Sequence, residues 1–193
     1  MSGLSVGFIG LGLIGGSIAK ALRAHYGSAI SILAFDADAG SMAKAVEDGT
    51  ADRTTSSICG DFSDCDVIYL CAPVGANVEN AIKVRPFMKE GAVLTDVGSV
   101  KGLMHEKMSA AGIDDVFVGG HPMAGSERIG YANSKENLFV NAYYIITRTG
   151  KAPEEYGRKI AELAEAIGAI PLPMDPEEHD RVTAAVSHVP HII

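Results

Sequence analysis

Positive charge is scarce in this sequence. The chain has 16 Lys and Arg residues against 24 Asp and Glu residues, which gives a formal net charge of −8 at pH 7. A negative field of this kind repels polyanions, so we expect no nucleic-acid partner. Any anionic ligand must be held by local hydrogen-bond donors rather than by the overall charge.

Long hydrophobic runs are also missing. The apolar stretch VGFIGLGLIGG near the N-terminus is interrupted by glycines and has no basic residues before it, which argues against a secretory signal. No segment approaches the roughly 18 uninterrupted apolar residues that a membrane span needs. We therefore expect no insertion into a membrane.

Cysteine is rare, and nothing suggests disulfides. The three cysteines, Cys59, Cys65 and Cys71, are odd in number and form no CxxC pair. We interpret them as reduced thiols in a cytoplasmic protein. Cys71 lies inside the apolar run DVIYLCAPV, where core packing is its expected role.

What the sequence does contain is a regular alternation of two kinds of segment. With 47% hydrophobic and 21% charged residues the chain is typical of a globular protein. Apolar runs rich in β-branched residues alternate with amphipathic stretches, which predicts βαβ units and a Rossmann-type, doubly wound α/β fold with a mostly parallel sheet. The expected strands are residues 5–10, 30–36, 67–72, 93–96, 116–118, 143–148 and 169–172. The expected helices are residues 15–25, 39–47, 76–85, 101–111, 153–167 and 176–193, with a polar loop and a short helix in 128–140.

The C-terminal stretch differs from the rest of the chain. The run RVTAAVSHVPHII is still apolar where the sequence ends at Ile193, with no helix cap. Such an end would be covered by a partner, or the sequence would continue in a longer protein. We expect a dinucleotide-binding domain over residues 1–174 and the first helix of a second, helical domain over residues 175–193.

A glycine-rich turn gives the strongest signal for a cofactor. Gly10, Gly12 and Gly15 form a GxGxxG motif between an expected strand and an expected helix, where backbone N–H groups can hold a pyrophosphate. Asp36 ends the next strand, where an acid accepts hydrogen bonds from the adenosine ribose. NAD is favoured over NADP, because no Arg follows Asp36 before Arg53 to hold a 2′-phosphate, and Lys44 is the only nearby cation.

Further cofactor contacts are expected at the same edge of the sheet, because ligands of open parallel sheets bind at the carboxyl ends of the strands. The segment Ala72-Pro73-Val74 follows the strand 67–72 there. The complete expected set is Gly10, Leu11, Gly12, Leu13, Ile14, Gly15, Asp36, Ala72, Pro73, Val74 and Ser99.

Two more strand ends bring reactive side chains to this edge. The segment TDVGSVKG carries Ser99 and Lys101, and GGHPMAGSE carries His121, Ser126 and Glu127. Removal of a hydride from a carbon that bears a hydroxyl requires an acceptor for the hydroxyl proton, and a histidine suits this role. We expect the glycines before His121 to turn the chain sharply off its strand. The two serines can equally be turn or helix caps.

The other histidines are interpreted by their surroundings. His25, His105 and His179 lie in polar helical stretches and are expected to face solvent. His188 and His191 share a helix face with Asp180, Thr183 and Ser187, which suggests a polar cleft. Two histidines on one face could bind a metal, but no third ligand has a fitting spacing, so we predict no metal site.

These motifs, taken together and in order, resemble the prephenate/arogenate dehydrogenase family of tyrosine biosynthesis. The resemblance covers essentially the whole chain, through VGFIGLGLIGGSIAKAL, APV, DVGSVKG, GGHPMAGSE, MDPEEHD and SHVPH. Two of these motifs, GGHPMAGSE and SHVPH, carry most of its specificity. Membership implies NAD-dependent oxidative decarboxylation of prephenate to 4-hydroxyphenylpyruvate, or of arogenate to tyrosine.

The resemblance also implies roles for individual residues. His121 would accept the proton of the substrate hydroxyl, and Ser99 would orient His121 and the nicotinamide. On the substrate side it implies contacts from Ser126, Glu127, His188, His191 and Lys101. It further implies a homodimer formed through an all-helical C-terminal domain that carries an arginine for the substrate carboxylates.

The motifs are also compatible with two other functions. A reductase of the β-hydroxyacid dehydrogenase type has the same fold and would use a lysine as acid, so Lys101 acting without His121 would favour it. The chain could also be a module that binds NAD without turnover.

Overall fold

The computed structural model describes residues 3–185, and a single eight-stranded sheet runs through this part of the chain in the order β3-β2-β1-β4-β5-β6-β7-β8. The strands are β1 (Leu4–Ile9), β2 (Ile30–Phe35), β3 (Arg53–Thr54), β4 (Val67–Leu70), β5 (Val93–Asp96), β6 (Phe117–Pro122), β7 (Tyr143–Thr147) and β8 (Ile170–Met174). From β3 to β6 all neighbours are parallel; β7 pairs antiparallel with β6, and β8 is parallel to β7. The predicted doubly wound Rossmann-type sheet is confirmed.

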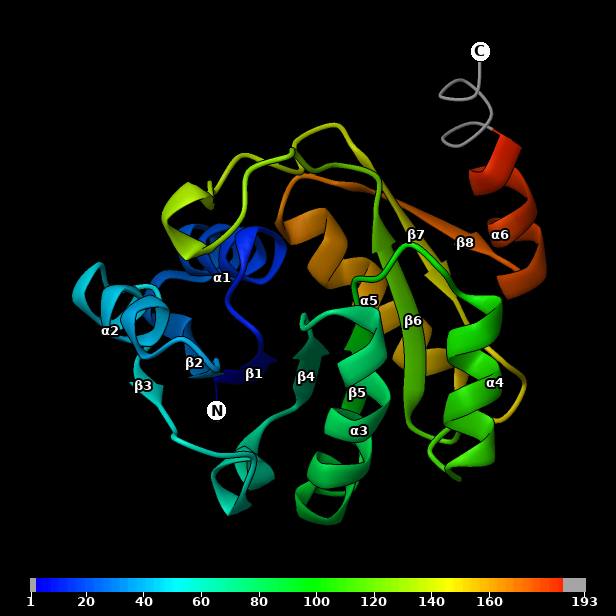
Figure 1. Cartoon of the computed structure of the whole chain (residues 1–193), viewed down its shortest axis with the longest axis horizontal. Helices are drawn as coiled ribbons and strands as arrows, with labels where there is room; N and C mark the ends of the chain where they lie inside the picture. Colours follow the sequence, from blue (N-terminus) through cyan, green and yellow to red (C-terminus); the bar gives the residue numbers. More distant parts are fainter. Residues whose placement is uncertain (1–2, 186–193) are drawn as a thin grey trace.

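Helices cover both faces of this sheet (Figure 1). They are α1 (Leu13–Tyr26), α2 (Ala39–Glu47), α3 (Val74–Val84), α4 (Gly102–Ala110), α5 (Glu154–Ala166) and α6 (Pro176–Thr183). Short 3₁₀ turns lie at η1 (Gly27–Ala29), η2 (Gly60–Asp64), η3 (Arg85–Phe87) and η4 (Tyr131–Asn133). The predicted short helix in the 128–140 loop is η4, whereas the two-residue strand β3 was not predicted.

Alternate side chains of β1, β2, β4, β5 and β6 enter two separate hydrophobic cores, because successive residues of a strand point to opposite faces. Phe8 and Tyr69 stack, with ring centroids 5.2 Å apart, in the core under α1 and α5. Their neighbours Ile9 and Leu70 lie in the core under α3 and α4. Cys71 packs against the first of these cores, which confirms its predicted packing role.

The strand order reverses between β1 and β4, since the chain moves outward to β2 and β3 and then returns past β1. At such a switch point the loops after the two strands separate and leave a crevice at the carboxyl edge of the sheet. The turn after β1 and the Ala72-Pro73-Val74 segment after β4 meet at this point, so the fold brings the predicted cofactor segments together.

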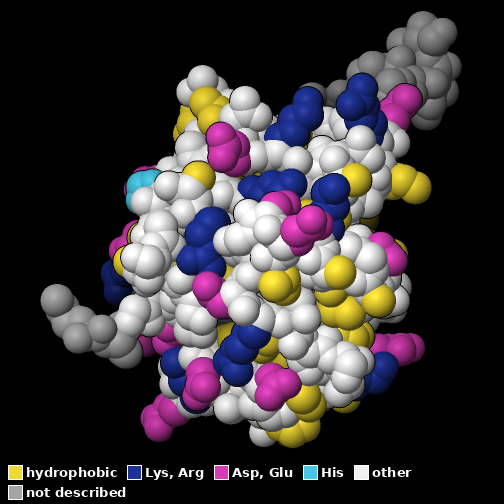
Figure 2. Space-filling model, turned by 90° about the vertical axis from the view of Figure 1, so that its left-hand side faces the viewer, with side chains coloured by type: hydrophobic (Ala, Val, Ile, Leu, Met, Phe, Trp, Pro, Cys, Tyr) yellow, Lys and Arg dark blue, Asp and Glu magenta, His cyan; other side chains and the backbone are white. Residues whose placement is uncertain are grey.

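Charged side chains of both signs are interspersed over the face shown in Figure 2, and the coloured residues there form no extended area of one sign. Within residues 3–185, no helix is both long and apolar enough to cross a membrane.

Candidate functional site

In the glycine-rich turn between β1 and α1, close packing against Cys71 requires glycine at positions 10 and 15. Gly10 has a φ of 107°, and a Cβ there would lie 2.6 Å from the carbonyl carbon of Cys71. A Cβ at Gly15 would lie 2.8 Å from the Cβ of Cys71. These glycines therefore allow α1 to pack closely on the end of β4.

Gly12 is different, because a Cβ at this position would have no atom of the described chain within 4 Å. Gly12 is also the N-cap of α1, and no side chain among the described residues caps this helix end. The first turn of α1 therefore presents free N–H groups beside open space, which is the arrangement that holds phosphates. These residues fit the pyrophosphate of a dinucleotide.

Asp36, directly after β2, lies against the same turn. Its carboxylate accepts hydrogen bonds from the backbone N–H of Leu11 at 2.5 Å and of Asp38 at 2.8 Å. This places an acid beside the glycine-rich turn, where a ribose hydroxyl would be expected.

A cavity of about 560 Å³ opens beside the turn, at the switch point of the sheet. Its lining includes the predicted residues Gly12, Leu13, Ile14, Ala72, Pro73, Val74, Ser99, His121 and Ser126. Arg128 and Ile129 also line it and were not predicted, although a cation directly after the GGHPMAGSE segment could have been noticed. Glu127 is exposed in the same loop and does not line the cavity.

His121 is half-buried at the wall of this cavity and belongs to a chain of side chains. Its Nδ1 is 2.8 Å from Nε2 of His179, and Nδ1 of His179 is 2.7 Å from the carboxylate of Asp180. Asp180 in turn accepts from the backbone N–H groups of Lys101 and Gly102, at the start of α4. Figure 1 shows α6, which carries His179 and Asp180, beside α4.

The prediction that His179 faces solvent was wrong, because His179 is fully buried. The buried residues of α6 are Pro176, His179 and Thr183, a helical spacing that identifies its inner face. That spacing in MDPEEHDRVT is the signal that could have located His179 and Asp180.

A buried ion pair lies beneath His121. The ammonium group of Lys101 is 2.5 and 2.6 Å from the two carboxylate oxygens of Asp96 and donates to the carbonyl of Gly120 at 2.7 Å. Both side chains of the pair have zero exposure. The predicted contact between Lys101 and a substrate is therefore corrected, since the Lys101 side chain has no exposed surface and supports β6 from below.

The glycines of GGHPMAGSE make room for this buried cluster. Gly119 and Gly120 lie within β6 and pair with β7, so the predicted sharp turn was wrong. A Cβ at Gly120 would lie 2.6 Å from the carbonyl oxygen of Asp96, and one at Gly119 would lie 3.0 Å from Nε2 of His105. The paired glycines are required by close packing rather than by a turn.

His105 is the second histidine whose predicted exposure was wrong. It is 4% exposed, its Nε2 is 2.8 Å from Oγ1 of Thr147, and its ring packs edge-on against Phe117. Burial, together with the nearby Lys101, lowers the pKa of His105 to about 4. His25 is exposed, as predicted.

The electrostatic environment favours a neutral His121. Burial lowers its pKa to about 4, helped by Lys101 and His179 and opposed by Asp180. For Asp180, burial raises the pKa, but the hydrogen bonds from Lys101 N–H, His179 and Gly102 N–H outweigh this and hold the pKa below its usual value. At neutral pH, His121 is therefore an uncharged hydrogen-bond partner and Asp180 is a carboxylate.

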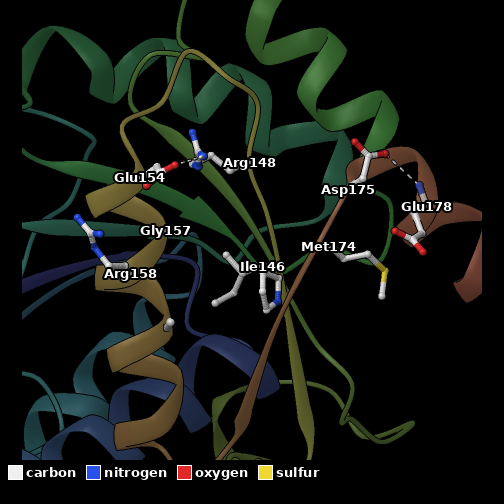
Figure 3. Close-up of a pocket in the computed structure, with 10 residues that line it drawn as sticks. Ile146, Arg148, Glu154, Gly157, Arg158, Met174, Asp175 and Glu178 are labelled. Atoms are coloured by element: carbon white, nitrogen blue, oxygen red, sulfur yellow. Dashed lines mark hydrogen bonds and ion pairs between the residues drawn. The ribbon is translucent and has the colours of Figure 1, made fainter.

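A larger cavity, of about 740 Å³, lies elsewhere, between β7, β8 and α5 (Figure 3). Its lining mixes cations and acids, including an Arg148–Glu154 pair at 3.9 Å. Size alone would favour this cavity, but it contains none of the glycine-rich turn, Ser99 or His121. The smaller cavity is the better candidate, because the N–H donors of the glycine-rich turn and the acceptor His121 both border it.

Two of the predicted substrate residues, His188 and His191, lie outside the described residues. Within residues 3–185, no group of three or more His, Cys, Asp or Glu side chains is placed to hold a metal ion.

These features define a Rossmann-type nucleotide-binding domain. The parallel sheet has an open glycine-rich turn at its switch point, an acid follows the second strand, and a neutral histidine lies across the cavity. Comparison with known proteins narrows this class. The sequence profile of the family "Prephenate dehydrogenase, nucleotide-binding domain" matches residues 18–171, and the chain belongs to this family.

Individual relatives agree with this assignment. The chain is 35% identical over 188 residues to a prephenate dehydrogenase of Lactococcus lactis subsp. cremoris, covering 96% of this chain and 50% of the relative. For the Bacillus subtilis prephenate dehydrogenase the identity is 34%, over 95% of this chain and 50% of the relative. The chain thus spans about half the length of these curated relatives.

Solved structures show the same fold. Prephenate dehydrogenase of A. aeolicus, in complex with hydroxyphenyl propionate and NAD+, has a TM-score of 0.91 and 37% identity, covering 100% of this chain and 67% of that chain. Synechocystis arogenate dehydrogenase has a TM-score of 0.90 and 31% identity, covering 98% of this chain and 66% of that chain.

Proposed function

We propose that this chain is the NAD-binding, proton-accepting part of a prephenate or arogenate dehydrogenase. The observation that carries the proposal is that the glycine-rich turn and the uncharged His121 line one cavity. Residues 1–174 form the dinucleotide-binding domain in this proposal, and residues 175–193 begin a helical domain. The A. aeolicus relative, whose structure is a complex with NAD+, supports the choice of cofactor, and the relatives named for prephenate and arogenate support the choice of substrates.

The cofactor site follows from the local geometry. The N–H groups at the start of α1, beside Gly12, would hold the pyrophosphate, and Asp36 would accept hydrogen bonds from the adenosine ribose. Ala72, Pro73, Val74 and Ser99 line the same cavity and would contact the nicotinamide part of the cofactor. NAD, when bound, accepts the hydride that leaves C4 of the cyclohexadienol ring.

Residues of this chain bind the substrate hydroxyl and accept its proton. His121 accepts a hydrogen bond from the substrate hydroxyl and takes its proton as the C–H bond breaks, while the ring carboxylate leaves as carbon dioxide. Ser99 orients the reacting groups. Ser126, Glu127, His188 and His191 are proposed for the substrate side. The homodimer and the cytoplasmic location are proposals carried over from the resemblance and from the cysteine usage.

The buried position of Lys101 argues against a reductase of the β-hydroxyacid type. The Lys101 side chain has zero exposure and is held by Asp96 and Gly120, so it cannot reach a substrate as an acid. The burial of Lys101 therefore supports His121, which lines the cavity, as the group that exchanges the proton with the substrate.

The test is NADH formation by the protein that carries this chain, with prephenate and arogenate each offered with NAD and NADP. We expect His121→Asn to lower turnover by at least about 100-fold, the usual contribution of acid–base assistance, while the Kd for NAD stays unchanged. His25→Asn, at an exposed position of α1, is the matched control. Unchanged turnover in His121→Asn would remove His121 from the mechanism, and NAD binding with no reduction by the unmodified protein would favour the binding module.

A further inference from the structure

Three side chains connect the wall of the cavity to the start of α4. Asp180, His179 and His121 follow one another at 2.7 Å and 2.8 Å, and the middle member is fully buried. The two outer members have fixed surroundings, because β6 holds His121 and two backbone N–H groups hold Asp180. The order of donors and acceptors along this chain decides where the proton of His121 lies.

The carboxylate of Asp180 determines which atoms donate and which accept along the three side chains. Asp180 accepts from the N–H of Lys101 at 2.8 Å through one oxygen and from that of Gly102 at 2.9 Å through the other. An ionised carboxylate can only accept, so Nδ1 of His179 must carry a proton and donate it to Asp180.

The remaining contact then has a single solution when each ring carries one proton. Nε2 of His179 has a lone pair, so the 2.8 Å contact requires a proton on Nδ1 of His121. Nε2 of His121 is left with its lone pair free. Thr183 Oγ1 lies 3.4 Å from the same nitrogen of His179, a longer contact that does not change this order.

From this geometry we propose that His179 is a positioning residue that fixes the tautomer of His121, so that His121 presents the Nε2 lone pair to the cavity. The inference rests on the proposed function for its catalytic meaning, because that lone pair is the acceptor for the substrate hydroxyl. When the O–H bond breaks and an Nε2–H bond forms, the Nδ1 proton remains in its bond to His179. The positive charge on His121 then lies next to a ring that is itself hydrogen-bonded to Asp180, which stabilises it.

The other charges around the pair are consistent with this direction. The Lys101 ammonium group, with Asp96, lies beneath β6, and the N-terminus of α4 points at Asp180. The backbone N–H groups of Lys101 and Gly102 help to hold the pKa of Asp180 below its usual value, so Asp180 remains an ionised acceptor at neutral pH.

The experiment measures the tautomer directly, without substrate or cofactor. In the ¹⁵N-histidine-labelled protein, long-range ¹H–¹⁵N correlation spectra at pH 7.5 should show His121 protonated at Nδ1 and unprotonated at Nε2. In His179→Phe, which keeps a buried ring but removes the acceptor, both nitrogens of His121 should give the averaged signals of a tautomer mixture. Thr183→Val, which removes only the longer contact, should leave the His121 spectrum unchanged.

A second variant covers the case in which His179→Phe does not fold. Asp180→Asn keeps the size of the side chain but lets it donate as well as accept, so it should also release the tautomer of His121. The proposal is overturned if His121 is protonated at Nε2 in the unmodified protein, or if neither variant changes the two nitrogen signals.

Turnover separates this inference from the proposed function. If the function also holds, His179→Phe should lower kcat by about 10- to 100-fold with little change in KM, because substrate contacts are kept and the acceptor is misoriented. If the tautomer is as expected but no substrate reduces NAD, the proposed function fails and the positioning role of His179 stands.

Discussion

Burial, helped by the nearby Lys101, keeps His121 uncharged, and this has a consequence for how it would accept a proton. With a pKa of about 4 it is a weak base in the free protein. A hydroxyl on a carbon that is losing hydride becomes strongly acidic, so a weak base that is already hydrogen-bonded to it can take the proton late in the step. His121 would therefore accept the proton because of its position and tautomer more than because of its basicity.

The cofactor preference also depends on a single residue. We predict that Asp36→Ala weakens NAD binding by roughly 10- to 100-fold, the size of a lost charge-assisted hydrogen bond, and weakens NADP binding less. The difference arises because the carboxylate repels a 2′-phosphate while accepting from a 2′-hydroxyl. The measurement is the Kd of each cofactor by fluorescence titration of NADH and NADPH.

The neighbouring acid provides the control for this prediction. Asp38 caps α2 by accepting from the N–H groups of Gly40 and Ser41, so Asp38→Ala should lower the stability of the helix start without changing the preference between cofactors. Equal losses of NAD and NADP affinity in Asp36→Ala would mean that the adenosine ribose is held by other groups.

The sequence could predict the position of a single residue where that residue belongs to a short motif. Gly12 and Asp36 follow their strands and His121 lies near the end of β6, so all three are at the carboxyl edge of the sheet, as their motifs predict. His105 and His179 could not be located in the same way, because their neighbours in sequence are charged. Their burial depends on Thr147 and His121, which are 42 and 58 residues away along the chain.

At the scale of elements, the Lys101–Asp96 pair joins β5, β6 and the start of α4. Asp96 ends β5 and also accepts from the backbone N–H of Gly120 at 3.1 Å, while Lys101 donates to the carbonyl of the same residue. A single ion pair thus satisfies backbone groups of β6 directly before His121. This explains why β6 continues through two glycines instead of ending at Val118.

We predict that Lys101→Met lowers the free energy of unfolding by about 3 to 5 kcal/mol, because it leaves the buried Asp96 carboxylate without its partner. The measurement is urea-induced unfolding followed by circular dichroism. Lys89→Met is the matched control: its partner Asp66 lies at 2.7 Å but the pair is partly exposed, so a loss of no more than about 1 kcal/mol is expected. Similar losses in both variants would show that the buried pair does not hold these elements together.

Most elements could be predicted, and the exceptions have physical reasons. The strands of the parallel part are short apolar runs buried on both faces, a pattern that a sequence displays clearly. The end of β6 was misjudged because glycine usually indicates a turn, whereas Gly119 and Gly120 lie in the strand to make room for Asp96 and His105. That requirement comes from another strand and a helix, so the local sequence does not contain it.

For the whole molecule, the buried histidines make stability depend on pH in a defined window. His105 and His121 have pKa values of about 4 in the folded state, against about 6.5 for a histidine in an unfolded chain. Between these values the unfolded chain binds more protons than the folded one, so the free energy of unfolding decreases as the pH falls from about 6.5 to 4. The carboxylates with lowered pKa values, such as Asp48 and Asp180, add to this loss only near the acid end of the window and below it, because a carboxyl in the unfolded chain has a pKa of about 3.8.

We predict that His105 alone accounts for about 2 kcal/mol of the stability lost between pH 7 and pH 5, from the separation of its two pKa values. His105→Gln, whose amide can take the place of Nε2 beside Thr147, should remove that part of the pH dependence even if it lowers stability at every pH. Urea unfolding at a series of pH values from 7 to 5 measures the slope, and His25→Gln on the exposed side of α1 controls for the loss of an imidazole. If His105→Gln keeps the full slope, the acid sensitivity of the fold arises from other groups, and the buried His105–Thr147 contact does not hold an uncharged ring.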